Sequence, residues 1–121
     1  MTMSQAYIVS PLRTPIGKFG GSLAPLHASQ LAAHVIRAVL DKSGFPQERI
    51  DELVVAQSYQ SSEAPCMGRY AASVAGLPDE VPGYTVDRRC GSGLQAVIDA
   101  SMQIQTGAAD AVLVAGVESM S

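Results

Sequence analysis

Two short runs of this sequence are apolar without interruption, and they narrow the possible folds more than any other feature. They are residues 53–56 (LVVA) and residues 111–115 (AVLVA). A strand with one solvent-exposed face alternates polar and apolar residues, whereas a strand buried on both faces is apolar throughout. Helical patterns separate these runs from the neighbouring β-type segments, as in parallel strands joined by helices. We therefore predict an α/β layered fold, with a mainly parallel sheet and helices on both faces.

Hydrophobic periodicity and turn residues predict the other elements. Apolar residues recur at helical spacing between residues 29 and 42, and Gly44 then offers a left-handed stop. Residues 6–10 are mostly apolar and end at Pro11, which predicts a first strand. The full set comprises strands at residues 6–10, 52–57, 83–87 and 111–115, helices at residues 29–42, 66–75 and 91–106, and a single helical turn at residues 46–50.

The composition excludes several classes of protein. The chain has 121 residues, enough for one compact core, and it is 47% hydrophobic and 16% charged, unlike a disordered chain. Its formal net charge of −3, with scattered Lys and Arg, offers no basic face for a nucleic acid. Apolar runs fall well short of the roughly 18 residues of a membrane span. Residues 1–5 do not resemble a signal peptide.

Cysteine usage points to a reducing compartment. Cys66 and Cys90 lack the spacing of a disulfide framework, so we expect a cytoplasmic protein. His27 and His34 do not lie at metal-ligand spacing with the cysteines, and no metal site is expected. We expect both histidines at the surface or at a helix cap, and Cys66 as a structural residue.

The predicted helix at residues 91–106 carries very little charge. Asp99 is its only charged residue, while Leu94, Ile98 and Met102 help to spread apolar contacts around much of the helix. A helix of this kind is more often buried than exposed. We therefore expect a residue at its start to lie at the bottom of a pocket.

Cys90 immediately precedes this helix and follows the predicted strand at residues 83–87. The first N–H groups of a helix lack intrahelical partners and carry partial positive charge, which favours a thiolate. Arg88 and Arg89 add positive charge beside it, and the thiolate is the nucleophilic form of cysteine. We predict an activated nucleophile on a strand-to-helix turn. From the local sequence alone, a small buried hydrophobe is an equally good interpretation.

A nucleotide-binding interpretation of the same turn is weaker. Residues 91–96 (GSGLQA) fit the fingerprint G-x-G-x-x-A between a strand and a helix, with Glu118 as a candidate ribose-binding acid. That fingerprint normally opens the first strand–helix unit of a fold, whereas here it opens the third. Close packing of the helix around a thiol explains the glycines equally well.

Four segments of the chain resemble the thiolases, the acyl-CoA acetyltransferases. Residues 86–96 (VDRRCGSGLQA) are similar to the segment that bears the family's nucleophilic cysteine. The other three resemble its first strand with an Arg-Thr-Pro-Ile-Gly loop, its second helix and the strand after the nucleophile helix; they are residues 8–23, 69–78 and 107–121. The sequence departs from the family at Asp87, where Asn is usual, and at Arg89, where an apolar residue is usual. Residues 64–69 also differ in part from the corresponding Asn-Pro-Ala-Arg segment of the family.

The resemblance implies acyl transfer through Cys90. Its thiolate would attack an acyl thioester to form an acyl-enzyme, with its backbone N–H as a candidate oxyanion donor. A second acetyl-CoA would then condense with the acyl group to give a 3-ketoacyl-CoA, and thiolysis is the reverse reaction. Coenzyme A and acyl-CoA are expected as substrates, with no permanently bound cofactor. Arg88 and Arg89 would attract the coenzyme A phosphates or form ion pairs at a subunit or domain contact, and we favour the ion pairs.

The resemblance also implies an assembly and further segments. Thiolases are dimers or tetramers, so we expect a homodimer or homotetramer, with residues 83–87 near the two-fold axis. The family's catalytic histidines and base cysteine come from later segments. Residues 1–121 are therefore expected to be the first, incomplete part of a thiolase N-terminal domain, nearly inactive alone. The alternative is a non-catalytic thiolase-like scaffold or dimerisation fragment.

Overall fold

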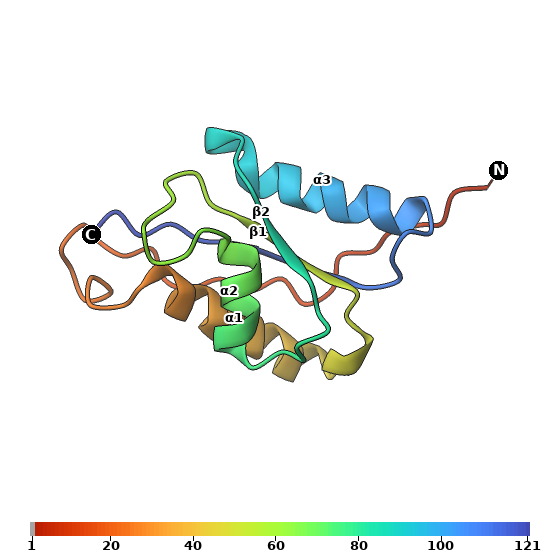
Figure 1. The fold of residues 1–121 in the computed structure, drawn as a ribbon, viewed down its shortest axis with the longest axis horizontal. Helices are drawn as coiled ribbons and strands as arrows, with labels where there is room; N and C mark the ends of the chain where they lie inside the picture. Colours follow the sequence, from red (N-terminus) through yellow and green to blue (C-terminus); the bar gives the residue numbers. More distant parts are fainter. Residues whose placement is uncertain (1) are drawn as a thin grey trace.

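Three parallel strands form one sheet, and helices cover both of its faces (Figure 1). The computed structural model describes residues 2–121. The strand order is β2-β1-β3, with α1 and α2 on one face and α3 on the other. In chain order the elements are α1 (Ala28–Ser43), the 3₁₀ turn η1 (Gln47–Arg49), β1 (Glu52–Ala56), α2 (Met67–Ala75), β2 (Gly83–Val86), the 3₁₀ turn η2 (Arg89–Gly91), α3 (Ser92–Gln105) and β3 (Val112–Gly116). The predicted α/β layered fold is confirmed.

The central strand β1 points its side chains alternately into two cores. Leu53 and Val55 belong to the larger core beneath α1 and α2. Val54 and Ala56 face α3, where they meet Ala96. These four side chains are at most 5% exposed. Because neither face of this strand is wet, polar residues are excluded from both, and the run is apolar throughout.

The predicted helices, the helical turn and three of the four predicted strands are confirmed, with each end displaced by no more than one residue. Helix α1 ends at Gly44, which adopts a left-handed φ of 66° and donates its N–H to Leu40 O at 2.9 Å. Gly76 ends α2 in the same way, with a φ of 77°. The stop at Gly44 occurs where the sequence predicted it, because a left-handed residue after a helix favours glycine.

The predicted strand at residues 6–10 is wrong, since residues 2–25 contain no helix or strand. Tyr7, Ile8 and Val9 are 75%, 78% and 67% exposed. An apolar, β-branched run becomes a strand only when another strand takes its backbone hydrogen bonds, and residues 6–10 make no backbone–backbone hydrogen bond within residues 2–121. They border a groove of about 970 Å³ whose other walls are α1, α3 and β3.

Helix α2 crosses β2 at a contact between two glycines. A Cβ atom at Gly68 would overlap the backbone of Tyr84, and one at Gly83 would lie 2.7 Å from the Gly68 carbonyl group. Real Cβ atoms do not approach backbone atoms this closely, so both positions require glycine here. Thr85 secures the same crossing, because its Oγ1 accepts the Gly68 N–H at 3.1 Å.

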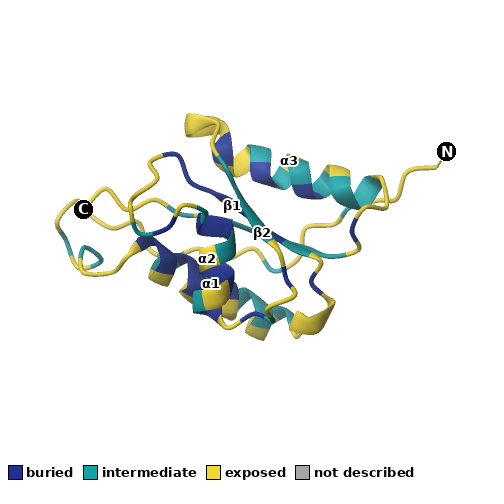
Figure 2. Cartoon of the chain, in the orientation of Figure 1, coloured by how far each residue is buried: buried dark blue, intermediate teal, exposed yellow. Residues whose placement is uncertain are grey.

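The prediction that α3 is a buried helix, with apolar contacts around much of its surface, is wrong within residues 2–121. Ala96 and Ala100 pack on the sheet at 0% and 6% exposure. Leu94, Ile98 and Met102 lie at intervals of four residues on the outward side, and they are 69%, 41% and 49% exposed. Figure 2 shows buried and exposed residues interspersed along this helix. Within the described part of the chain, small residues of α3 face the sheet and no layer covers its outward side.

Candidate active site

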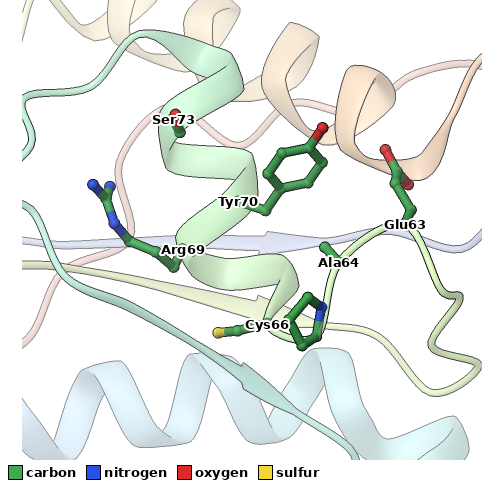
Figure 3. Close-up of a pocket in the computed structure, with 7 residues that line it drawn as sticks. Glu63, Ala64, Cys66, Arg69, Tyr70 and Ser73 are labelled. Atoms are coloured by element: carbon green, nitrogen blue, oxygen red, sulfur yellow. The ribbon is translucent and has the colours of Figure 1, made fainter.

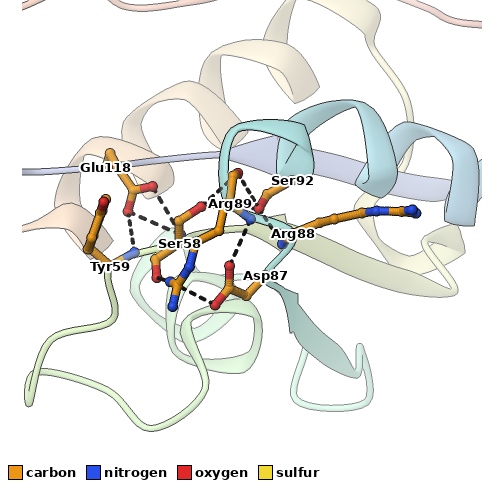
Figure 4. Close-up of polar contacts among 7 residues, drawn as sticks. All are labelled: Ser58, Tyr59, Asp87, Arg88, Arg89, Ser92 and Glu118. Atoms are coloured by element: carbon orange, nitrogen blue, oxygen red, sulfur yellow. Dashed lines mark hydrogen bonds and ion pairs between the residues drawn. The ribbon is translucent and has the colours of Figure 1, made fainter.

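The carboxyl ends of the three parallel strands meet at one edge of the sheet. Ser58 lies two residues after β1, Asp87 directly after β2, and Glu118 two residues after β3. Open parallel sheets bind their ligands at this edge. Figure 4 shows these three residues together with Arg89, in the link from β2 to α3, and Ser92, the first residue of α3. The site is therefore built from three strands that are far apart in the sequence.

Glu118 fastens the end of β3 to the end of β1. Its two carboxylate oxygens accept the Ser58 N–H at 3.2 and 3.0 Å, and Oε1 also accepts the Tyr59 N–H at 3.1 Å (Figure 4). Val117 adds a backbone hydrogen bond to Ala56 O at 3.0 Å. Both oxygens of the Glu118 carboxylate thus accept hydrogen bonds from backbone N–H groups of the chain. This arrangement does not support the ribose-binding role considered for Glu118.

Two buried hydroxyl groups converge on the carbonyl oxygen of Arg89. Ser58 Oγ donates to it at 2.8 Å and Ser92 Oγ at 2.7 Å. Ser92 Oγ also accepts the Arg88 N–H at 2.6 Å. Ser58 is 9% exposed and Ser92 is 4% exposed. The peptide group that joins Arg89 to Cys90 is therefore held from two directions.

Arg89 has a left-handed backbone, with a φ of 49°. This conformation costs a non-glycine residue roughly 1–2 kcal/mol, so local contacts must hold it. Asp87 Oδ1 accepts the Arg89 N–H at 3.0 Å, and Asp87 Oδ2 pairs with the guanidinium at 3.1 Å. The guanidinium also donates to Ser58 O at 2.7 Å and lies 5.7 Å from the centre of the Tyr59 ring. Arg89 thus forms an ion pair inside the chain, whereas the ion pair favoured from the sequence was one at a subunit or domain contact, which stays a prediction.

Cys90 lies in η2 and its thiol is exposed. The turn agrees with the predicted position between a strand and a helix, but within residues 2–121 Cys90 does not lie at the bottom of a pocket. Cys90 lines neither the 970 Å³ groove nor a smaller cavity of about 260 Å³. The reason is the uncovered outer side of α3, which leaves the start of this helix open. The Cys90 N–H makes no hydrogen bond within residues 2–121, whereas the Gly91 N–H is donated to Arg88 O at 3.0 Å.

The glycines after Cys90 do not have the predicted packing role within the described chain. A Cβ atom at Gly93 would meet nothing within 4 Å, and one at Gly91 would touch only the side chain of Arg88 at 3.8 Å. Arg88 itself extends along α3, where its guanidinium donates to Gln95 Oε1 at 2.5 Å. Neighbouring elements of residues 2–121 therefore do not require these two glycines.

Cys66 lies apart from Cys90, at the start of α2. The half-buried thiol contacts β2, donating to Gly83 O at 3.5 Å and accepting from Thr85 Oγ1 at 3.8 Å. It borders the smaller cavity of about 260 Å³, shown in Figure 3. That cavity is lined by Glu63, Ala64, Pro65, Cys66, Arg69, Tyr70 and Ser73.

His27 and His34 are both exposed, as predicted, and both belong to the α1 side of the sheet. His27 caps α1, and its backbone N–H is donated to Gln30 Oε1 at 2.9 Å. Within residues 2–121, no cluster of three or more His, Cys, Asp and Glu side chains is arranged to hold a metal ion. Nor is any helix of this part of the chain long and apolar enough to cross a membrane.

Comparison with known proteins gives the family of the chain. The family model described as the thiolase N-terminal domain matches residues 6–121. Acetyl-CoA acetyltransferase of Cupriavidus necator is 43% identical over 119 residues, covering 98% of this chain and 30% of the relative. The β-ketoadipyl-CoA thiolase of Pseudomonas knackmussii is also 43% identical, covering 97% of this chain and 30% of the relative.

A solved structure has the same fold. The crystal structure of Bacillus anthracis acetyl-CoA acetyltransferase superposes with a TM-score of 0.95 at 38% identity, covering 98% of this chain and 30% of that one. The chain belongs to the thiolase family, as its sequence predicted. It spans about 30% of the length of the curated relatives it matches.

Proposed function

We propose that the protein containing residues 1–121 is an acyl-CoA acetyltransferase, and that Cys90 is its nucleophile. The observation that carries the proposal is the location of Cys90 in a chain of the thiolase family. It stands on the turn from β2 to α3, beside the carboxyl edge of the sheet, with its thiol exposed. A thiolate suits this chemistry because it is both a strong nucleophile and a good leaving group.

The reaction proceeds in two steps. The Cys90 thiolate attacks the carbonyl carbon of an acyl thioester, and coenzyme A leaves as its thiolate, which forms the acyl-enzyme. The α-carbon of a second acetyl-CoA, after losing a proton to a base, attacks that acyl group and expels Cys90. The product is a 3-ketoacyl-CoA, and the reverse sequence is thiolytic cleavage. Coenzyme A is thus a substrate, and no cofactor is held permanently.

The oxyanion formed in each step needs preorganised donors. The Cys90 N–H is a suitable donor because it lies at the approach to a helix and makes no hydrogen bond within residues 2–121. The doubly held peptide group of Arg89 fixes the direction of this N–H. In this proposal the oxyanion is stabilised by the Cys90 N–H, a backbone group that the hydrogen bonds to Arg89 O already hold in place.

The base is assigned to segments of the protein other than residues 2–121. His27 and His34 belong to α1, which packs on the face of the sheet opposite α3. The uncovered side of α3 and the groove beside β3 offer surfaces on which further segments would pack. In this proposal, residues 1–121 are the first part of an N-terminal domain, and the whole protein works in the cytoplasm.

Replacing Cys90 tests this assignment. In the active protein, Cys90→Ser is expected to abolish cleavage of acetoacetyl-CoA while leaving the circular dichroism spectrum unchanged. Cys66→Ser is the matched control, since it removes a thiol that contacts β2, and its turnover should stay within about threefold of the original. Full turnover of Cys90→Ser would contradict the proposal.

A non-catalytic scaffold is the second candidate, favoured by the absence of a histidine beside Cys90 within residues 2–121. The two candidates are distinguished by assaying residues 1–121 alone and the whole protein separately. We expect them to cleave acetoacetyl-CoA far below the roughly 1 per second of ordinary enzymes. If the whole protein also shows no turnover yet still associates with itself, the scaffold function is correct.

A further inference from the structure

The residue before Cys90 is held in a conformation that its type disfavours. Arg89 has a φ of 49°, and glycine takes such values far more readily. The direction in which the next residue projects depends on this angle. Relaxation of Arg89 to an ordinary negative φ would therefore turn the Cys90 thiol away from its present position.

The Arg89 side chain reaches back to contacts that hold this conformation. Asp87 accepts the Arg89 N–H with one carboxylate oxygen and the guanidinium with the other, at 3.0 and 3.1 Å. The guanidinium also donates to Ser58 O at 2.7 Å. Backbone and side chain of the same residue are thus tied to one carboxylate, so rotation about φ would strain both ends.

Tyr59 adds a third contact, because the guanidinium carbon lies 5.7 Å from the centre of its ring. Tyr59 and Ser58 are themselves fixed by the Glu118 carboxylate. The support therefore extends from the Asp87 side chain to the ends of β1 and β3, and it does not depend on η2 alone.

We propose that Arg89 is a positioning residue that sets the direction of the Cys90 thiol. Its guanidinium is hydrogen-bonded to Asp87 and to the Ser58 carbonyl, and these bonds keep the Arg89 backbone left-handed. This inference rests on the proposed function of Cys90. It assigns Arg89 a role different from attracting the phosphates of coenzyme A, because its guanidinium contacts Asp87, the Ser58 carbonyl and the Tyr59 ring inside the chain. Asp87 and Arg89 are also two positions at which this sequence departs from the usual thiolase segment.

Arg88 provides the matched control. It carries the same charge next to the same turn, yet its guanidinium donates to Gln95 Oε1, on α3, and makes no hydrogen bond or ion pair with Asp87 or Ser58 within residues 2–121. A general effect of positive charge on the thiol or on coenzyme A would be lost equally from Arg88→Ala and Arg89→Ala. Positioning would be lost from Arg89→Ala alone.

The experiment compares variants of the active protein that contains residues 1–121. For Arg89→Ala we expect kcat for thiolysis and the rate of Cys90 acylation by acetyl-CoA to fall about tenfold, with KM changed less than about twofold. Alkylation by iodoacetamide, a small reagent that tolerates many thiol directions, should change by less than about threefold. Arg89→Lys, which keeps the pairing with Asp87, should recover at least half of the lost rate. Arg88→Ala should behave like the original protein.

A double variant of Asp87 and Arg89 completes the test, because it measures the energetic coupling between these two residues. Asp87→Asn combined with Arg89→Ala should be no slower than Arg89→Ala alone, since both remove the same support. The proposal is overturned if Arg89→Ala acylates normally, if Arg88→Ala is equally slow, or if alkylation falls as far as acylation. Acyl transfer that proceeds without modifying Cys90 in the original protein would overturn the proposed function as well.

Discussion

Glu118 and Ser58 join two strands at the edge of the sheet where Cys90 lies. The carboxylate of Glu118 accepts the Ser58 N–H with both oxygens, at 3.0 and 3.2 Å. Ser58 in turn donates its hydroxyl hydrogen to Arg89 O. The ends of β1 and β3 are therefore linked, through one serine, to the residue that precedes the candidate nucleophile.

Glu118→Ala should destabilise the protein by about 1–2 kcal/mol, because two backbone N–H groups lose a charged acceptor at a partly exposed site. Glu118→Gln keeps one oxygen and should lose about half of that. Urea unfolding followed by circular dichroism measures the difference. Equal stability of the alanine variant and the original protein would contradict the bracing role of Glu118.

Gly68→Ala should destabilise the protein by about 3 kcal/mol or more, because the new Cβ would overlap the backbone of Tyr84 and force α2 away from β2. Gly93→Ala is the control, since a Cβ there meets nothing within 4 Å and helix propensity favours alanine over glycine. Its stability should change by less than about 1 kcal/mol. Thermal unfolding of the two variants checks this contrast, which a tolerated Gly68→Ala would refute.

Asp51 should make stability depend on acid. Backbone hydrogen bonds from Ala111, at 3.0 Å, and Asp110, at 2.7 Å, lower the pKa of Asp51 below its ordinary value of 3.8. Because the folded pKa is depressed, the contribution is present above the unfolded value and lost as the pH falls through the folded value. Asp51→Asn should flatten that part of the profile.

Urea unfolding between about pH 6 and about pH 2 measures the effect. We expect the stability difference between the original protein and Asp51→Asn to shrink as the pH falls below the ordinary aspartate range. Glu80→Gln is a suitable control on the surface. A difference that stays constant across this range would contradict the role of the Asp51 carboxylate.

The outer edge of β2 should carry a contact between two copies of the protein. β2 pairs only with β1 within residues 2–121, so its other edge has unpaired backbone groups. Val86 O bonds to Gln57 N on the β1 side, and alternate residues face opposite edges, which directs the Thr85 N–H outward. A two-fold axis would pair this edge with its own copy in antiparallel sense.

Thr85→Pro should therefore weaken a dimer or tetramer measured by light scattering, since proline lacks the outward N–H. Thr85→Ala is the matched control, because both substitutions remove the hydroxyl that accepts the Gly68 N–H. Only the proline variant should dissociate. A monomeric original protein at high concentration would show that this edge is not an interface.

The sequence predicted the elements whose cause is local or compositional. The central strand could be found because burial on both faces excludes polar residues, and Gly44 marked the end of the first helix. Residues 6–10 could not be judged in this way, since a strand also needs a neighbouring strand, and none pairs with them within residues 2–121.

The candidate site was only partly predictable, for a similar reason. Cys90 could be proposed as the nucleophile from the sequence because a cysteine just before a helix favours the thiolate. Ser58 and Glu118 were missed as partners, since only the register of three parallel strands brings them together. Their positions just after two predicted strands were the available signal. The left-handed backbone of Arg89 could not be predicted from the sequence, because arginine, unlike glycine, rarely adopts a positive φ.

The most direct test of the central claim is to locate the acyl group. The active protein is incubated with acetyl-CoA, quenched in acid and digested, and its peptides are analysed by mass spectrometry. We predict an acetyl thioester on Cys90 and none on Cys66, and loss of the adduct in Cys90→Ser. An adduct on Cys66 in an active sample, or turnover without any adduct on Cys90, would contradict the account.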